Sequence, residues 1–118
     1  MAQMLQPVRG THDLLPDSYM SHSRVIDSAQ ATALLYGFQR MDTPLFEFSE
    51  VFHRAVGETS DIVSKETYTF TDRGGESITL RPEFTAAIVR SVLSNGLQQS
   101  LPFKCFYAGP AFRYERPQ

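Results

Sequence analysis

The stretch Leu80-Arg81-Pro82-Glu83-Phe84-Thr85-Ala86 decides the fold of this chain, because it joins two patterns of different period. Polar and apolar residues alternate before it, as in a half-buried strand, whereas apolar residues recur at helical spacing after it. Pro82 can open that helix, since the N–H group that proline lacks would have no partner in the first turn. The pair Asn95-Gly96 then predicts the end of the helix.

A β-hairpin is predicted immediately before this junction. Tyr68–Phe70 and Ser77–Leu80 alternate around Asp72-Arg73-Gly74-Gly75, which has the glycines of a tight turn. Further strands are predicted where short apolar runs lie between breaks. They cover residues 38–44, which a proline ends or places at a sheet edge, residues 103–108 and residues 111–115.

Two helices are predicted in the first half of the chain. The longer one has Asp17 or Ser18 as its cap and Gly37 as its stop, and the shorter one runs from Ser49 to about Val56 before a polar loop at residues 57–65. One face of the long helix carries a stripe of mostly small side chains: His22, Val25, Ile26, Ala29, Ala33 and Tyr36. These elements predict a single α+β domain over residues 1–118, with a mainly antiparallel sheet and flanking helices.

The composition excludes several classes of protein. The hydrophobic fraction of 42% and the charged fraction of 20% are those of an ordinary globular domain. The formal net charge is −2 and the cations are scattered, which argues against a DNA-binding surface, since phosphate binding needs clustered Lys and Arg. No leader pattern and no membrane-spanning run is found, so we expect a cytoplasmic protein without a membrane partner.

Cysteine and histidine usage gives two further expectations. Cys105 is the single cysteine and lies in an apolar stretch, so it is predicted to pack in the interior. His12, His22 and His53 are isolated and lack the paired spacing of metal ligands, so no protein-held metal is expected.

Two groups of polar residues are candidates for chemistry. Glu83 and Thr85 stand at a predicted helix N-terminus, where unpaired backbone N–H groups favour an ionised carboxylate; they can receive a ligand ammonium group or simply cap the helix. Arg113 and Glu115 are two residues apart on a predicted strand and therefore project from one face. A buried arginine needs an anion, and its planar fork suits phosphate or carboxylate, whether this belongs to a ligand or to Glu115 or Glu83.

These motifs resemble those of one family. Phe112-Arg113-Tyr114-Glu115 resembles motif 2 of class II aminoacyl-tRNA synthetases. The chain is also similar over nearly its whole length to histidyl-tRNA synthetases. Besides Phe112–Glu115, four segments carry this similarity: Arg9-Gly10-Thr11-His12-Asp13-Leu14-Leu15-Pro16, Gly57-Glu58-Thr59-Ser60-Asp61-Ile62-Val63, Lys65-Glu66-Thr67-Tyr68-Thr69-Phe70-Thr71-Asp72-Arg73 and Leu80–Ala86. The resemblance implies a partial class II catalytic core, with motif 1 at about residues 18–44 and the start of motif 2 at about residues 103–118. Motif 1 forms the dimer interface in the family, which implies a homodimer.

The resemblance also implies roles for individual residues. Glu83 and Thr85 would hold the α-amino group of histidine, and Arg113 would contact both the α-phosphate of ATP and the histidine carboxylate. Glu115 would line the ATP site, with Mg²⁺ entering only together with ATP. Phe84 stands where the family commonly has glycine, so its side chain must either lie against the sheet or enter the histidine site and change its size.

The implied activity is that of a histidine–tRNA ligase, which forms histidyl-adenylate from histidine and ATP and transfers histidine to tRNA(His). Enzymes of this family are several times longer, so we expect residues 1–118 to be a fragment that is inactive in isolation. Two alternatives share the same ancestry: the synthetase-like regulatory subunit of ATP phosphoribosyltransferase, and a non-catalytic synthetase-like module. The presence of Glu83, Thr85 and Arg113 together favours the enzyme.

Overall fold

The computed structural model describes residues 3–56 and 66–114. In chain order its elements are α1 (Pro16–Leu35), β1 (Gln39–Arg40), β2 (Phe46–Phe48), α2 (Ser49–Val56), β3 (Thr69–Thr71), β4 (Ser77–Leu80), α4 (Thr85–Ser94), the 3₁₀ helix η1 (Leu97–Ser100) and β5 (Cys105–Phe106). The three-stranded sheet has the order β2-β4-β3 and is antiparallel, and β1 pairs with β5 in a separate parallel pair. The predicted α+β class is confirmed.

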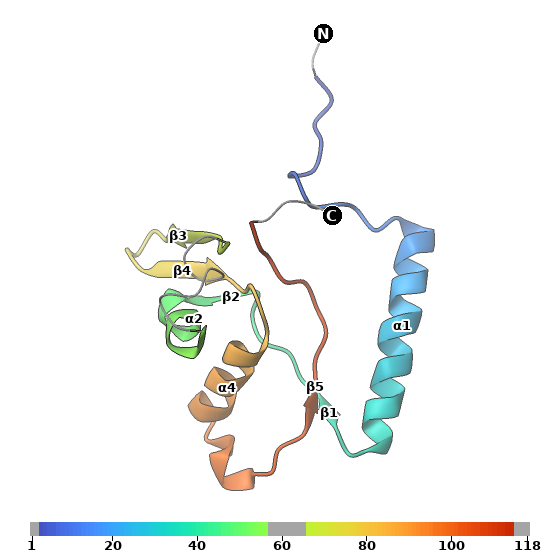
Figure 1. Ribbon diagram of the computed structural model, residues 1–118, viewed down its shortest axis with the longest axis vertical. Coiled ribbons are helices and arrows are strands. Elements are labelled where there is room, and N and C mark those ends of the chain that lie inside the picture. The colour runs from blue at the N-terminus through green and yellow to red at the C-terminus, as the bar shows by residue number, and fades with distance from the viewer. Residues whose placement is uncertain (1–2, 57–65, 115–118) are drawn as a thin grey trace.

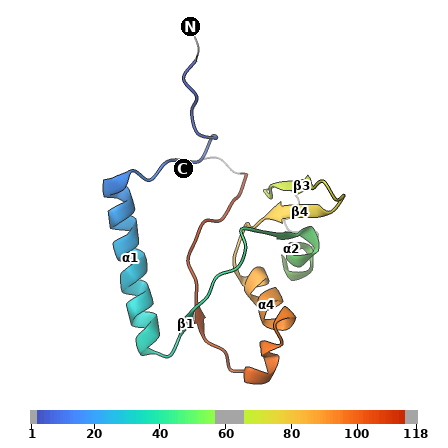
Figure 2. The same cartoon turned by 180° about the vertical axis from the view of Figure 1, so that it is seen from behind.

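The elements form two parts that are joined through the β1–β5 pair. In Figures 1 and 2, α2 and α4 lie on one side of the three-stranded sheet, whereas α1 stands apart on the far side of β1 and β5. The radius of gyration is 17.1 Å. A compact domain of this length would have a radius of about 13–14 Å, so the described chain is open.

The sheet has one polar and one apolar face, as its register shows. Thr79 of β4 lies opposite Glu47 of β2 and Thr69 of β3, and these three share a face. The Thr79 hydroxyl group is hydrogen-bonded to the hydroxyl groups of Ser49 (2.7 Å) and Thr69 (2.9 Å). The other face carries Phe48, Ile78 and Phe70 in register. The buried hydrophobic residues of the described chain are few: Phe52, Ile78, Ala86 and Ala87.

Several predicted elements are confirmed. The hairpin forms from β3 and β4, and Gly75 in its turn has φ +88°, a left-handed conformation that glycine adopts without strain. Helix α2 has the predicted bounds. Gly37 follows the last turn of α1 with φ +84°, as expected of a glycine stop.

The predicted Asp17 or Ser18 cap of α1 is wrong. The helix begins at Pro16, and Leu15 is the residue that precedes it. Proline is suited to the first helical position because its φ is already helical and it lacks an N–H group. The predicted stripe is also only partly correct: Ile26 and Ala33 are half-buried, but Val25 is 70% exposed, and no residue of α1 is buried.

The helix that was predicted to open at Pro82 begins instead at Thr85. The N–H group of Ala86, which the Pro82 carbonyl would accept in a longer helix, donates to the Glu83 carboxylate. The Pro82 carbonyl accepts the Nε–H group of Arg113 instead. Side-chain contacts of Glu83 and Arg113 therefore take the place of the first turn of the predicted helix.

The strands predicted at residues 38–44, 103–108 and 111–115 are shorter or absent in the described chain. Only Gln39–Arg40 and Cys105–Phe106 pair as strands. Residues 111–114 form no ladder, because Phe112 donates its N–H group to Arg81 and Tyr114 donates its own to Glu66, on two different segments.

Candidate functional site

Glu83 caps helix α4 with its side chain. Its carboxylate accepts the backbone N–H groups of Thr85 (2.6 Å) and Ala86 (3.1 Å). The capping alternative that the sequence left open is therefore present in the structure. A carboxylate can accept about four hydrogen bonds, so these contacts fix its position and leave capacity for a ligand donor.

Glu83 and Thr85 line a groove between α2, α4 and the start of β4. The groove has a volume of about 930 Å³. Apolar side chains of α2 and α4 line it, among them Val51, Val89 and Leu93. Its polar lining includes Glu50, Glu76 and Arg54, and Arg54 forms an exposed ion pair with Glu50 at 2.9 Å.

Phe84 is directed away from this groove, and it is not among the residues that line it. Its ring packs against Tyr107 with 5.6 Å between ring centroids, and the Arg81 guanidinium lies 4.6 Å from the Phe84 centroid. This contact with a cation explains how a phenylalanine is accommodated between Glu83 and Thr85.

Arg113 lies beside the same helix start. Its Nε–H group donates to the carbonyl of Pro82 at 2.9 Å, and the residue is otherwise exposed. Within residues 3–56 and 66–114 Arg113 forms no ion pair, so the predicted alternative of pairing with Glu83 is not found. Arg113 does not line the groove, and Glu115 lies outside the described residues.

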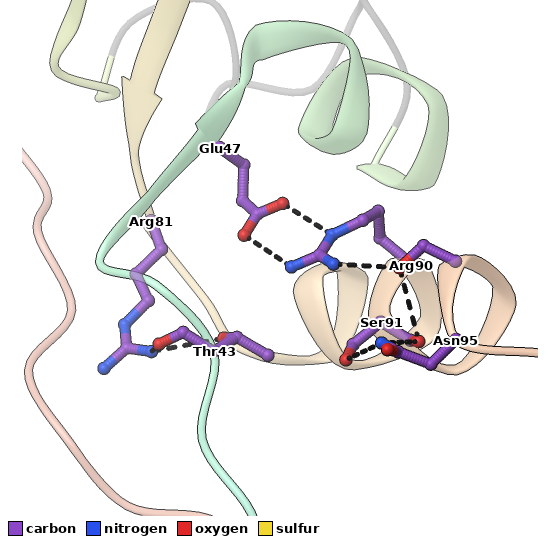
Figure 3. Close-up of polar contacts among 7 residues, drawn as sticks. Thr43, Glu47, Arg81, Arg90, Ser91 and Asn95 are labelled. Atoms are coloured by element: carbon purple, nitrogen blue, oxygen red, sulfur yellow. Dashed lines mark hydrogen bonds and ion pairs between the residues drawn. The ribbon is translucent and has the colours of Figure 1, made fainter. Parts of the chain in front are cut away.

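Arg81 is the residue whose importance the sequence patterns did not reveal. It is only 1% exposed, and its guanidinium donates to the carbonyls of Pro110 (2.8 Å) and Thr43 (3.2 Å). Figure 3 shows this side chain directed toward Thr43. Asp42 lies 3.5 Å away, but its side chain is 67% exposed. The sequence signal was an arginine placed between a predicted strand and a predicted helix, since a cation at such a junction needs partners from elsewhere in the chain if it is buried.

A second arginine contact, to the buried carboxylate of Glu47, connects the sheet to α4. Arg90 donates from Nε and Nη2 to the two carboxylate oxygens of Glu47, at 2.7 Å and 2.9 Å (Figure 3). Glu47 comes from β2, and its side chain is only 6% exposed. This bidentate pair fixes α4, and with it Glu83 and Thr85, against the sheet.

Cys105 is half-buried, and burial raises the pKa of its thiol. Across the part of the chain that the structure describes, no group of three or more His, Cys, Asp or Glu side chains is arranged to hold a metal ion. In the same residues, no helix has both the length and the apolar character needed to cross a bilayer.

Comparisons with known proteins identify the family. A family model described as histidyl-tRNA synthetase matches residues 10–118. The histidine–tRNA ligase of Gluconacetobacter diazotrophicus is 60% identical over 114 residues, which is 97% of this chain and 28% of that protein. The chain thus spans little more than a quarter of the length of this curated relative.

Two solved structures have the same fold. The apo histidyl-tRNA synthetase of S. aureus is 35% identical with a TM-score of 0.78, over 96% of this chain and 27% of that one. A Bacillus halodurans protein described as an ATP phosphoribosyltransferase regulatory subunit/histidyl-tRNA synthetase is 26% identical with a TM-score of 0.80, over 99% and 30% of the two chains. With the family model matching most of the sequence, this chain belongs to the histidyl-tRNA synthetase family.

Proposed function

We propose that this chain supplies the first part of the active site of a histidine–tRNA ligase. The whole protein would activate histidine with ATP to histidyl-adenylate, release pyrophosphate and transfer histidine to tRNA(His). The observation that carries this proposal is the 60% identity to a histidine–tRNA ligase across the segment that holds Glu83, Thr85 and Arg113.

In this proposal Glu83 and Thr85 bind the α-amino group of histidine. The two backbone N–H groups that Glu83 accepts hold its carboxylate in place before the ligand arrives. A carboxylate positioned in this way loses little rotamer freedom on binding, which favours affinity. Thr85 is exposed, so its hydroxyl group is accessible to the same ammonium group. Phe84 stays against Arg81 and Tyr107, so it would not reduce the size of the histidine site.

Arg113 would bring the two reacting groups together. Its Nε–H group is held by the Pro82 carbonyl, which leaves the Nη groups free to turn toward an α-phosphate and a carboxylate. The histidine carboxylate is itself the nucleophile, so the protein contributes positioning and charge stabilisation without a nucleophilic side chain. Glu115 would line the ATP site, and Mg²⁺ would arrive with ATP.

We also propose that the whole protein is a cytoplasmic homodimer that uses motif 1 at residues 18–44, with motif 2 starting at residues 103–118. Helix α1 supports the dimer, since large apolar side chains remain uncovered on it: Val25 is 70% exposed and Leu35 is 85% exposed. Apolar surface of this extent favours association.

The regulatory alternative is supported by the Bacillus halodurans structure, whose description joins both functions. A regulatory subunit would have the same fold but would not form an adenylate. Histidine-dependent ATP–pyrophosphate exchange separates the two possibilities. The protein for this assay is a chimera in which this chain replaces the matching segment of the Gluconacetobacter diazotrophicus relative.

Arg113→Lys in this chimera tests the site. Lysine keeps the charge but loses the planar fork, so we expect the activation step to lose about 2–4 kcal/mol, as when one oxyanion donor is removed. The melting temperature should change little, because the structure shows one hydrogen bond from this exposed side chain. Arg73→Lys in the hairpin turn is the matched control. Near-normal single-turnover activation by Arg113→Lys would reject the catalytic role, and an inactive parent chimera would count against the proposed function itself.

A further inference from the structure

Arg81 binds several segments that are distant in sequence. Its Nε–H group donates to the Pro110 carbonyl (2.8 Å), and its Nη1 donates to the Thr43 carbonyl (3.2 Å) and lies 3.5 Å from Asp42. The backbone of Arg81 adds two more bonds: its N–H group donates to Leu45, and its carbonyl accepts the N–H group of Phe112, both at 2.9 Å. The segments at 42–45 and 110–112 are thus fixed to one residue.

These bonds lie next to both proposed halves of the site. Phe112 directly precedes Arg113, and Arg113 in turn donates to Pro82, the residue after Arg81. Glu83 follows Pro82, and the ring of Phe84 covers the Arg81 guanidinium at 4.6 Å. A displacement of Arg81 would therefore move Arg113 and Glu83 relative to each other.

Gly109 shows how tightly the chain packs around this guanidinium. A Cβ atom added at Gly109 would lie 2.5 Å from Nη2 of Arg81, well inside van der Waals contact. The cation cannot retreat far, because Arg81 is 1% exposed and Phe84 lies over it. Alanine at this position would force the guanidinium or the 109–112 backbone to shift.

We propose that Arg81 is a positioning residue for adenylate formation: its buried guanidinium sets the distance between Arg113 and the Glu83–Thr85 turn. The inference rests on the proposed function. Stability alone is a weak reason for this residue, because burying a cation is costly and Asp42, its one carboxylate partner among residues 3–56 and 66–114, is largely exposed. Its fork geometry binds two carbonyls from different segments, which a lysine ammonium group or an apolar side chain would not reproduce.

The test uses two substitutions in the chimera, Arg81→Lys and Gly109→Ala, with two controls. Phe52→Leu is the stability control, since Phe52 is fully buried in α2 and is not one of the proposed site residues. Arg40→Lys is the control for arginine chemistry, because Arg40 donates to the Ala108 carbonyl from the β1 side. We expect kcat for pyrophosphate exchange to fall about 100-fold in the two test variants at saturating histidine and ATP, as misplacement by about 1 Å produces. We expect both controls to keep kcat within about two-fold of the parent, since neither moves the reacting groups.

A second readout does not depend on turnover. The Arg113 Nε–H signal is followed by ¹⁵N NMR in the 118-residue chain, where its bond to Pro82 should slow solvent exchange. We expect Arg81→Lys and Gly109→Ala to speed that exchange, and Arg40→Lys to leave it unchanged.

The outcomes separate the two proposals. An inactive parent chimera refutes the proposed function, whereas an active parent whose Arg81→Lys and Gly109→Ala variants retain kcat refutes the positioning role. If Arg81→Lys does not fold, Gly109→Ala decides, because it displaces the guanidinium without removing it. If Phe52→Leu, contrary to expectation, loses as much kcat as Arg81→Lys at the same melting temperature, the loss reflects stability and the positioning role of Arg81 is refuted.

Discussion

Removing Arg90 should destabilise the domain more than removing its partner Glu47. The Glu47 side chain is 6% exposed and accepts both N–H groups of a bidentate pair, whereas the Arg90 side chain is 33% exposed. Arg90→Met leaves a carboxylate without its cation where water has little access. Breaking a buried pair in this way costs about 3–5 kcal/mol, and the partial exposure of Arg90 places our expectation at about 3 kcal/mol. Glu47→Gln keeps one acceptor and lets Arg90 turn to water, so we expect about 1 kcal/mol.

Urea unfolding of the 118-residue chain, followed by circular dichroism, measures the difference. With a slope of about 1.5 kcal/mol/M, the midpoint should fall by about 2 M for Arg90→Met and by less than about 1 M for Glu47→Gln. The double variant Glu47→Gln/Arg90→Met should be more stable than Arg90→Met alone, because the unpaired charge has gone. Equal midpoints for the two single variants, or a double variant that is weaker than both, would refute this reasoning.

Three further outcomes are expected. The 118-residue chain alone should show no histidine-dependent pyrophosphate exchange above a mock preparation, because weak contacts from part of a site do not offset the cost of ordering a ligand. Leu35→Glu on α1, where Leu35 is 85% exposed, should lower the sedimentation coefficient at high concentration if α1 self-associates, and a monomeric parent would contradict this. The Cys105 thiol, whose pKa is raised by burial, should be alkylated more slowly than a free thiol near pH 8. The alkylation rate should rise with pH through a midpoint above that of a free thiol, and a rate that does not change with pH would contradict this expectation.

The sequence predicted the elements whose signals are local. The hairpin follows from alternation around Asp72–Gly75, and α2 follows from a short stretch that begins at Ser49 and ends before a polar loop. The end of α1 follows from Gly37, which has a positive φ. In each case neighbouring residues determine the backbone, so one segment carries the information.

The sequence failed where distant segments decide the structure. The start of α4 moved to Thr85 because Arg113, far along the chain, takes the Pro82 carbonyl. Residues 111–114 form no strand because their N–H groups go to Arg81 and Glu66. The candidate site was found through family motifs, and the capping bonds of Glu83, which reach only two and three residues along the chain, were among the alternatives that the sequence offered. The packing of Phe84 and the burial of Arg81 depend on tertiary contacts that no spacing rule contains.

The parallel pairing of β1 with β5 constrains the order of folding during synthesis. Arg40 and the Ala108 carbonyl that it contacts are 68 residues apart, so β1 has no partner strand until β5 has left the ribosome. The hairpin, α2 and α4 require only shorter loops to close, which lowers their entropic cost. We therefore expect nascent chains arrested after α4 to protect the β2-β4-β3 sheet from proteolysis while α1 remains cleavable. Equal protection of both parts at that length would show that α1 docks without β5.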